Sequence, residues 1–315
     1  MSKYQYRNNA RLTGYHSVAL RNYPHRHNYL RDLIRRLDRV PQILPASYAE
    51  TARTRGQHCR NMAAIASRIG LQHNQVKFRQ SLSMAAMLHD IGHATHGHAS
   101  ERAINEWLGY TAFSNDHHSC RVLYFQSSKE NFDVPMFTTP AFECLPHLSY
   151  PMQPSPLSAR LEQSQAITPK SRVLEFLDDL ENTIGDSGDL ARNAVGQVNV
   201  LSEELCPQAR VVFQMHETVN AVLFCMRRFG FDGSYNSLLS LSQPASAIQE
   251  LMAKARVEIE NLRVHSKLIQ AYDIHAREQT LDMCEWAHHL DPGIERGCSE
   301  QWVIDVVSAI DLEVC

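Results

Sequence analysis

The sequence contains none of the segments by which proteins enter or cross a membrane. Its N-terminus, MSKYQYRNNARL, lacks the apolar core of a signal peptide, and no run approaches the roughly 18 apolar residues of a transmembrane helix. The eight cysteines are scattered and form no CxxC pair, which argues against a disulfide framework and against a zinc knuckle. We therefore expect a soluble cytoplasmic protein with reduced thiols and no membrane partner.

The chain also lacks an excess of positive charge. The formal net charge is -3, so no overall field holds a nucleic-acid backbone and any such binding needs a local patch. We expect single-stranded nucleic acid to be at most a weak partner. With 315 residues and 43% hydrophobic content, the chain can build a sizeable core. We expect one domain over residues 1–315, with a motif core at about 26–190 and a C-terminal helical part at 191–315.

Strand signals are missing as well, because there is no convincing apolar–polar alternation and no Asn-Gly hairpin turn. Apolar residues instead recur at helical spacing, as at Met62, Ile65 and Ile69. The periodicity predicts helices within residues 58–70, 84–88, 168–186, 207–230, 246–260, 263–290 and 299–310. Six prolines between Pro135 and Pro156 exclude long helices from that stretch, where we expect an ordered insertion or lid. The sequence thus predicts an all-α fold.

Titratable side chains are concentrated in one segment, LHDIGHATHGHASE, residues 88–101. Its histidines are His89, His93, His96 and His98. The first two have the i, i+4 spacing of the HExxH zinc-protease motif, but no glutamate follows the first histidine, and Gly92 would weaken a helix between them. A metalloprotease is therefore not the function that this segment favours.

A metal site of another kind fits the sequence better. His89 and Asp90 are adjacent and follow an apolar helical segment, and His58 opens another predicted helix. Imidazole nitrogen combined with carboxylate oxygen suits manganese, iron, magnesium or similar ions. A further carboxylate is expected from an apolar helix, and TPKSRVLEFLDDLENTIGD (168–186) supplies Asp178 beside its apolar stripe.

The order H…HD…D resembles the signature of the HD-domain metal phosphohydrolases. Within them the chain resembles the deoxyguanosine triphosphate triphosphohydrolase (dGTPase) family. Its bacterial members typically show RRL-x3-TQVF, RTRLTH, HDIGHPPFGHxGE and a helix with DD-I. This chain has, in the same order, RRLDRVPQIL (35–44), RTRGQHC (53–59), HDIGHATHGHASE (89–101) and LDDLENTIGD (177–186). The resemblance covers residues 26 to 190, and the C-terminal third has no clear match.

The resemblance implies a fold and a role for each matching residue. The fold would be an HD-domain helical bundle around a metal site. The metal ligands would be His58, His89, Asp90 and Asp178, which would hold Mn²⁺, Mg²⁺ or Fe²⁺. The catalytic pair would be His98 and Glu101. The substrate-binding residues would be Arg55 and His93 at the phosphates, Gln42 at the 3′-hydroxyl, and Asp186 and Tyr272 at the sugar.

The activity that the resemblance implies is hydrolysis of a dNTP, dGTP by default, to a deoxynucleoside and tripolyphosphate by a homo-oligomer. A divalent ion would polarise the phosphoryl group, and His98 would exchange a proton near neutral pH. Two alternatives stay open. One is an HD-type nucleoside 5′-monophosphatase or pyrophosphatase, and the other is a non-catalytic, nucleotide-sensing HD module.

Some positions depart from the family pattern. Ala94, Thr95 and His96 replace the usual Pro-Pro-Phe, and Asn115 stands where the family often has histidine. These departures bear on nucleotide preference more than on the metal site. Two related activities are disfavoured. HDIGHAT lacks the Glu-Asp pair of guanosine tetraphosphate hydrolases, and neither Gly-Tyr pair is followed by the proline that cyclic-di-GMP phosphodiesterases need.

Overall fold

The computed structural model describes residues 34–45, 53–69, 76–111, 113–116, 118–119, 122, 169–192, 218–289, 303–304 and 307–308. In this part of the chain the fold is all-α, as the sequence predicts, with an isolated β-bridge between Pro41 and Thr54. The helices are α3 (Arg55–Arg68), α4 (Val76–Leu88), α5 (His98–Leu108), α9 (Pro169–Arg192), α12 (Thr218–Arg228), α13 (Tyr235–Leu241), α14 (Ala247–His265) and α15 (Lys267–His289). Among them, none combines the length and the apolar character needed to cross a bilayer.

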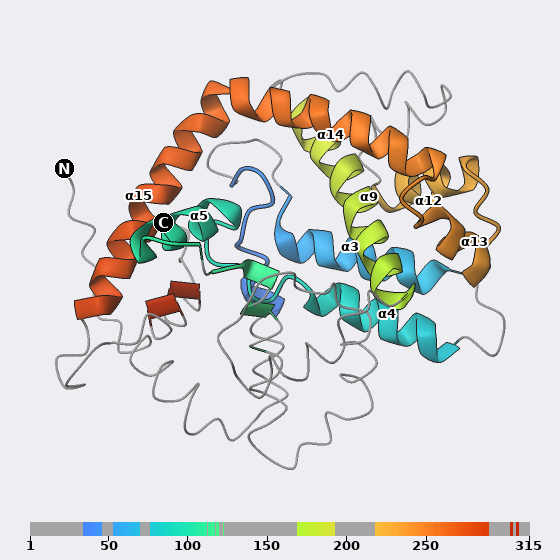
Figure 1. The fold of residues 1–315 in the computed structure, drawn as a ribbon, viewed down its shortest axis with the longest axis horizontal. Coiled ribbons are helices and arrows are strands. Elements are labelled where there is room, and N and C mark those ends of the chain that lie inside the picture. The colour runs from blue at the N-terminus through green and yellow to red at the C-terminus, as the bar shows by residue number, and fades with distance from the viewer. Residues whose placement is uncertain are drawn as a thin grey trace, which may run out of the picture.

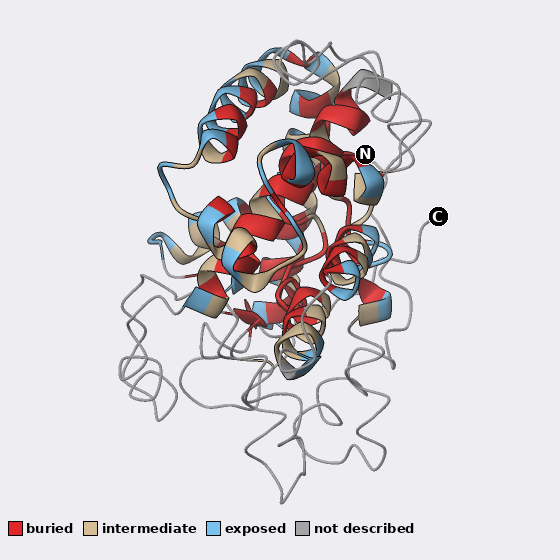
Figure 2. Ribbon diagram, turned by 90° about the vertical axis from the view of Figure 1, so that its right-hand side faces the viewer, coloured by how far each residue is buried: buried red, intermediate tan, exposed pale blue. Residues whose placement is uncertain are grey.

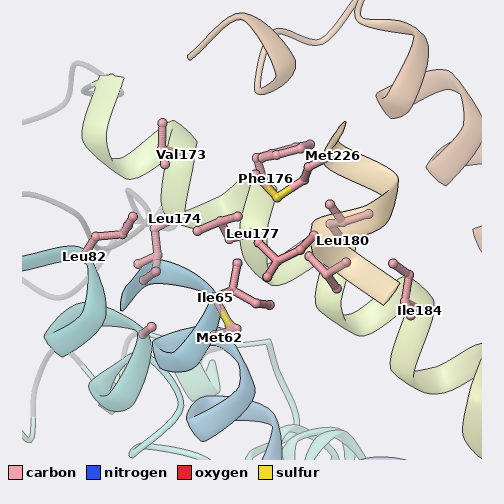
Figure 3. Close-up of a cluster of buried hydrophobic side chains, with 14 of the residues drawn as sticks. Met62, Ile65, Leu82, Val173, Leu174, Phe176, Leu177, Leu180, Ile184 and Met226 are labelled. Carbon is pink, nitrogen blue, oxygen red and sulfur yellow. The ribbon is translucent and has the colours of Figure 1, made fainter. Parts of the chain in front are cut away.

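The larger hydrophobic core is built around α9, which contacts α3, α4, α12, α13 and α14 (Figure 1). Leu174, Leu177 and Leu180 of α9 are buried, and their spacing of three residues places them on one side of the helix. They belong to the same cluster as Met62 and Ile65 of α3 (Figure 3). This apolar contact fixes the position of α9 relative to α3.

Helices α14 and α15 form an arch over the rest of the described chain (Figure 1). Ser266 separates them, and its hydroxyl accepts a hydrogen bond from the Ile269 backbone N–H at 3.3 Å, which caps the start of α15. α14 packs on α9, and α15 packs on α5. In the second contact, Ile104 of α5 lies in one cluster with Met283 and Cys284 of α15. Across the described chain, buried residues gather toward the middle of the fold and exposed residues toward its outside (Figure 2).

The start of α3 differs from the sequence prediction. We expected a helix opened by His58, but α3 begins at Arg55, because the Thr54 hydroxyl accepts a hydrogen bond from the Gln57 backbone N–H at 3.1 Å and caps the helix there. His58 therefore lies in the first turn of a regular helix.

Other predicted helices are present, although α9 extends to Arg192, past the expected end at 186, and the expected start of the 207–230 helix lies outside the described residues. α9 begins at Pro169 and α12 is followed by Gly230, whose φ of 101° ends the helical geometry. The regions predicted at 246–260 and 263–290 are α14 and α15. The proline-rich stretch at 135–156 lies outside the described residues. Of the helix expected at 299–310, the described residues 303–304 and 307–308 are helical.

Candidate metal centre

Three separate segments bring the ligand candidates together. His58 lies in the first turn of α3, His89 and Asp90 lie in the turn that follows α4, and Asp178 lies on α9. Because α3 packs against both α4 and α9, residues more than 100 positions apart in the sequence meet at one point. The packing of these helices, and not proximity in the sequence, assembles the site.

The turn after α4 is fixed by contacts with two other parts of the chain. α4 ends before His89, so His89 and His93 do not share a helix. Gly92 does not weaken a helix here; a Cβ at this position would lie 2.1 Å from the Ser119 nitrogen, so the glycine permits close approach of another backbone. Arg36 donates a hydrogen bond to the carbonyl of His93 at 2.6 Å. The histidine-rich turn is thus held on both sides.

Three of the four ligand candidates, His58, His89 and Asp178, meet at one point, and Asp90 joins them through His89. Nε2 of His58 lies 3.2 Å from Nε2 of His89 and 2.9 Å from Oδ1 of Asp178. Nε2 of His89 lies 3.5 Å from Oδ1 of Asp90 and 3.5 Å from Oδ1 of Asp178. Two nitrogen atoms at about 2.1 Å from one ion are about 3.0–3.4 Å apart at tetrahedral to octahedral angles. The observed spacing therefore suits a single shared ion.

Both imidazoles present Nε2 to this point because Nδ1 is engaged elsewhere. Nδ1 of His89 lies 2.9 Å from the carbonyl oxygen of Ala86, to which it donates. Nδ1 of His58 contacts the carboxylate of Glu181. A histidine that donates from Nδ1 keeps a lone pair on Nε2, which is the form that binds a metal ion.

The charges around the two histidines favour a cation. Burial lowers the pKa of His58, but Glu181 and Asp178 outweigh this effect and raise the pKa to about 10. Burial likewise lowers the pKa of His89, yet Asp90 and Asp178 help to hold it well above its usual value. Nitrogen and carboxylate donors in a negative potential are the environment that a divalent ion needs, so the residues present fit a metal site.

Asp90 is positioned by two further side chains. Arg55 donates to Oδ2 of Asp90 at 2.9 Å, and Nε2 of His93 lies 3.0 Å from Oδ1. Burial, followed by the charge of Arg55, lowers the pKa of His93 to about 3, so His93 is neutral and donates to Asp90. Nε of Arg55 and Nδ1 of His93 are buried with no hydrogen-bond partner in the described structure.

The predicted catalytic pair lies at the start of α5. Nδ1 of His98 is 2.8 Å from Oε2 of Glu101, and Asn115 donates to the same oxygen at 2.7 Å. Although burial raises the pKa of Glu101, the hydrogen bond and charge of His98 lower it overall, so the carboxylate is ionised. The ring of His98 lies edge-on to that of His93 with centroids 5.1 Å apart, and 53% of the His98 side chain is exposed. An oriented, accessible imidazole therefore stands beside His93, which contacts the ligand candidate Asp90.

Gln42 is connected to the ligand candidates through one residue. Its Nε2 donates to Oδ1 of Asn182 at 2.6 Å, and Nδ2 of Asn182 donates to Oδ1 of Asp178 at 2.8 Å. Oε1 of Gln42 is buried with no hydrogen-bond partner among the described residues. This acceptor is available to a hydroxyl of a bound molecule.

The two residues expected at the sugar have protein partners. Asp186 forms an ion pair with Arg53 at 2.7 Å. The Tyr272 hydroxyl lies 3.1 Å from Nδ1 of His96, and Tyr272 is buried on α15. Neither Asp186 nor Tyr272 belongs to a candidate metal-binding group of the described residues.

Sequence reasoning missed Glu181 and Arg53. Glu181 is fully buried, accepts hydrogen bonds from Arg53 at 2.7 Å and Asn61 at 2.9 Å, and contacts His58. A signal was present, because Glu181 lies four residues after Leu177 and so falls on the apolar stripe of α9. A carboxylate on such a stripe requires buried partners.

One comparison with known proteins identifies the central part of the chain. The family model of the HD domain matches residues 55–183, a segment that contains the four ligand candidates together with His98 and Glu101. No curated protein matches the chain. The match places these residues in an HD domain, typically a metal-dependent hydrolase that binds divalent ions, and it does not distinguish the dGTPase family within that superfamily.

We expect the His58→Ala variant to bind Mn²⁺ more than about 100-fold more weakly than the parent, since losing a direct ligand should exceed the loss from an outer hydrogen-bond partner. Calorimetric titration with Mn²⁺ measures the change. The His265→Ala variant is the matched control, because His265 is exposed at the end of α14 and should leave the affinity unchanged. Parent-like Mn²⁺ binding by His58→Ala would contradict the site.

Proposed function

We propose that this protein is a metal-dependent dNTP triphosphohydrolase, which converts a dNTP, by default dGTP, into a deoxynucleoside and tripolyphosphate. The observation that supports this best is the group of His58, His89 and Asp178, with Asp90 against His89. The His98–Glu101 pair lies next to His93, which contacts Asp90. The HD domain found at residues 55–183 contains both groups and supports phosphohydrolase chemistry. The dNTP is the finer part of the proposal and rests on the resemblance of the sequence blocks.

The phosphate end of the substrate would lie against Arg55 and His93. A divalent ion, when bound, supplies Lewis-acid activation of the phosphoryl group and of the attacking water. Arg55 has a buried Nε without a partner in the described structure, which can donate to a phosphate oxygen, while its Nη1 keeps Asp90 in place. Neutral His93 holds the other oxygen of Asp90.

In the reaction, water attacks the α-phosphorus and the bond from phosphorus to O5′ breaks. The O5′ oxygen must take a proton as the deoxynucleoside leaves, and His98 is the residue that we assign to this transfer. Glu101 holds the His98 ring through Nδ1, which leaves Nε2 available to a bound substrate. The chain thus supplies ligands, phosphate contacts and a proton donor from neighbouring residues.

Gln42 is the residue that we assign to the deoxyribose. Its buried Oε1 is an acceptor without a partner in the described structure and would accept a hydrogen bond from the 3′-hydroxyl. Buried polar groups that a wrong substrate leaves unpaired reject that substrate strongly. Asp186 and Tyr272 stay in the proposal as residues near the sugar, with Arg53 and His96 as their present partners.

The central test is a substrate panel of dNTPs, rNTPs and dNMPs with Mn²⁺ or Mg²⁺, in which phosphate, pyrophosphate and tripolyphosphate are quantified separately. We expect tripolyphosphate from dNTPs, and turnover of dGTP well above that of GTP, because the sugar contacts discriminate. Phosphate from dNMPs would instead identify a 5′-monophosphatase, and pyrophosphate from dNTPs a pyrophosphatase. Nucleotide binding without any product would identify a sensing module.

The role of His98 has its own test. His98→Ala should retain Mn²⁺ affinity and lose on the order of 10²–10⁴-fold in turnover, the usual contribution of a general acid or base. Single-turnover rates measured beside Mn²⁺ titrations separate the two effects, and His265→Ala again serves as the exposed-histidine control. If His98→Ala turned over dNTPs like the parent, His98 would not be the proton donor.

A further inference from the structure

Gly185 lies inside α9, where glycine is a poor helix former. The structure gives a specific reason for it. A Cβ at this position would lie 1.4 Å from Nη1 and 2.0 Å from Cζ of Arg53. The guanidinium of Arg53 therefore rests directly against the helix backbone at Gly185, and any larger residue there would displace it.

Arg53 in this position binds carboxylates along α9. Its Nη1 lies 2.7 Å from Glu181, its Nη2 lies 2.7 Å from Asp186, and its Nε lies 3.3 Å from Asp189. Arg53 is itself buried, and a buried cation requires such partners. The absence of a side chain at Gly185 thus makes room for a guanidinium that neutralises the buried face of α9.

Glu181 connects Arg53 to the candidate metal centre through His58. One of its oxygens receives hydrogen bonds from Arg53 at 2.7 Å and Asn61 at 2.9 Å, which leaves the other oxygen directed at Nδ1 of His58. With a metal ion bound, Nδ1 would donate its proton to Glu181 and Nε2 would offer its lone pair to the ion, on the side of His89 and Asp178. Such a carboxylate–histidine pair orients a ligand imidazole and increases its basicity.

We propose that Glu181 is a positioning residue for metal binding, held by Arg53, and that Gly185 is present because Arg53 occupies the space a side chain would need. This inference rests on the metal-dependent activity proposed above and assigns a determinant of its metal affinity. Glu181 contacts no substrate in this scheme. It acts through the orientation and tautomer of His58.

The test is the Mn²⁺ affinity of Glu181→Gln in the full chain. Glutamine has the same size but a single acceptor oxygen, so it cannot serve both Arg53 and His58. We expect Mn²⁺ binding about 10–100-fold weaker than in the parent, and recovery of turnover toward the parent value at saturating Mn²⁺. The matched control is Asp189→Asn, because Asp189 also faces the buried Arg53 but is on the Nε side, away from the edge that holds Glu181.

Asp189→Asn should keep Mn²⁺ affinity within about threefold of the parent, well below the range for an outer partner of a ligand. Equal weakening of Mn²⁺ binding in both variants would overturn the proposal. The loss would then come from the removal of a negative charge beside Arg53 and not from the contact between Glu181 and His58. Parent-like affinity in Glu181→Gln would overturn it directly. A parent protein that binds no Mn²⁺ would also overturn the proposal. A parent protein that binds Mn²⁺ but hydrolyses no nucleotide would contradict only the proposed function.

Gly185→Ala provides a second test that removes no charged group. In an ordinary helix this change stabilises the fold. Here it should displace Arg53, lower the resistance of the protein to urea, and weaken Mn²⁺ binding in the same direction as Glu181→Gln. A more stable Gly185→Ala protein with parent-like Mn²⁺ affinity would show that Arg53 does not hold Glu181 in the way proposed.

Discussion

The packing of α9 against α3 places two carboxylates on the two nitrogens of a single buried imidazole. Leu174, Leu177 and Leu180 fix the position of α9 in the core, and the next side of the same helix carries Asp178 and Glu181. Because these residues are three positions apart, about one helical turn, they can flank one ring. Asp178 lies at Nε2 of His58 and Glu181 at Nδ1, so apolar packing determines where the polar site forms.

Buried charge then decides what the site can bind. Isolated carboxylates would be costly in the interior, and arginine side chains compensate this cost for some of the carboxylates and not for others. Arg53 neutralises the Glu181 side and Arg55 holds one oxygen of Asp90, while His58, His89 and Asp178 present their donor atoms to one another. A divalent cation held by these residues would supply positive charge there, and the exposed His98 lies next to His93, which contacts Asp90.

The sequence was sufficient for the residues that meet at the site but not for those that hold them. Spacing predicted the helices, and the motif order predicted that His58, His89, Asp90 and Asp178 belong together. The structure brings His58, His89 and Asp178 close to one another and places Asp90 against His89. The sequence did not show that α3 begins at Arg55, because apolar spacing does not locate the hydrogen bond from the Gln57 backbone N–H to the Thr54 hydroxyl that starts the helix. It also could not show the role of Gly92 or Gly185, since close approach of a distant backbone or of Arg53 is a tertiary property. Glu181 was visible as a carboxylate on an apolar stripe, yet its partners come from α3 and from Arg53, just before α3.

Anomalous diffraction from crystals of the Mn²⁺-loaded protein is the sharpest test of a shared metal site, because it locates the ion without reference to activity. A shared site gives one strong manganese peak at about 2.0–2.3 Å from Nε2 of His58, Nε2 of His89 and a carboxylate oxygen of Asp90 and of Asp178, the range of nitrogen and oxygen ligands. A manganese peak elsewhere in the molecule, with these four side chains unchanged and unliganded, would contradict it.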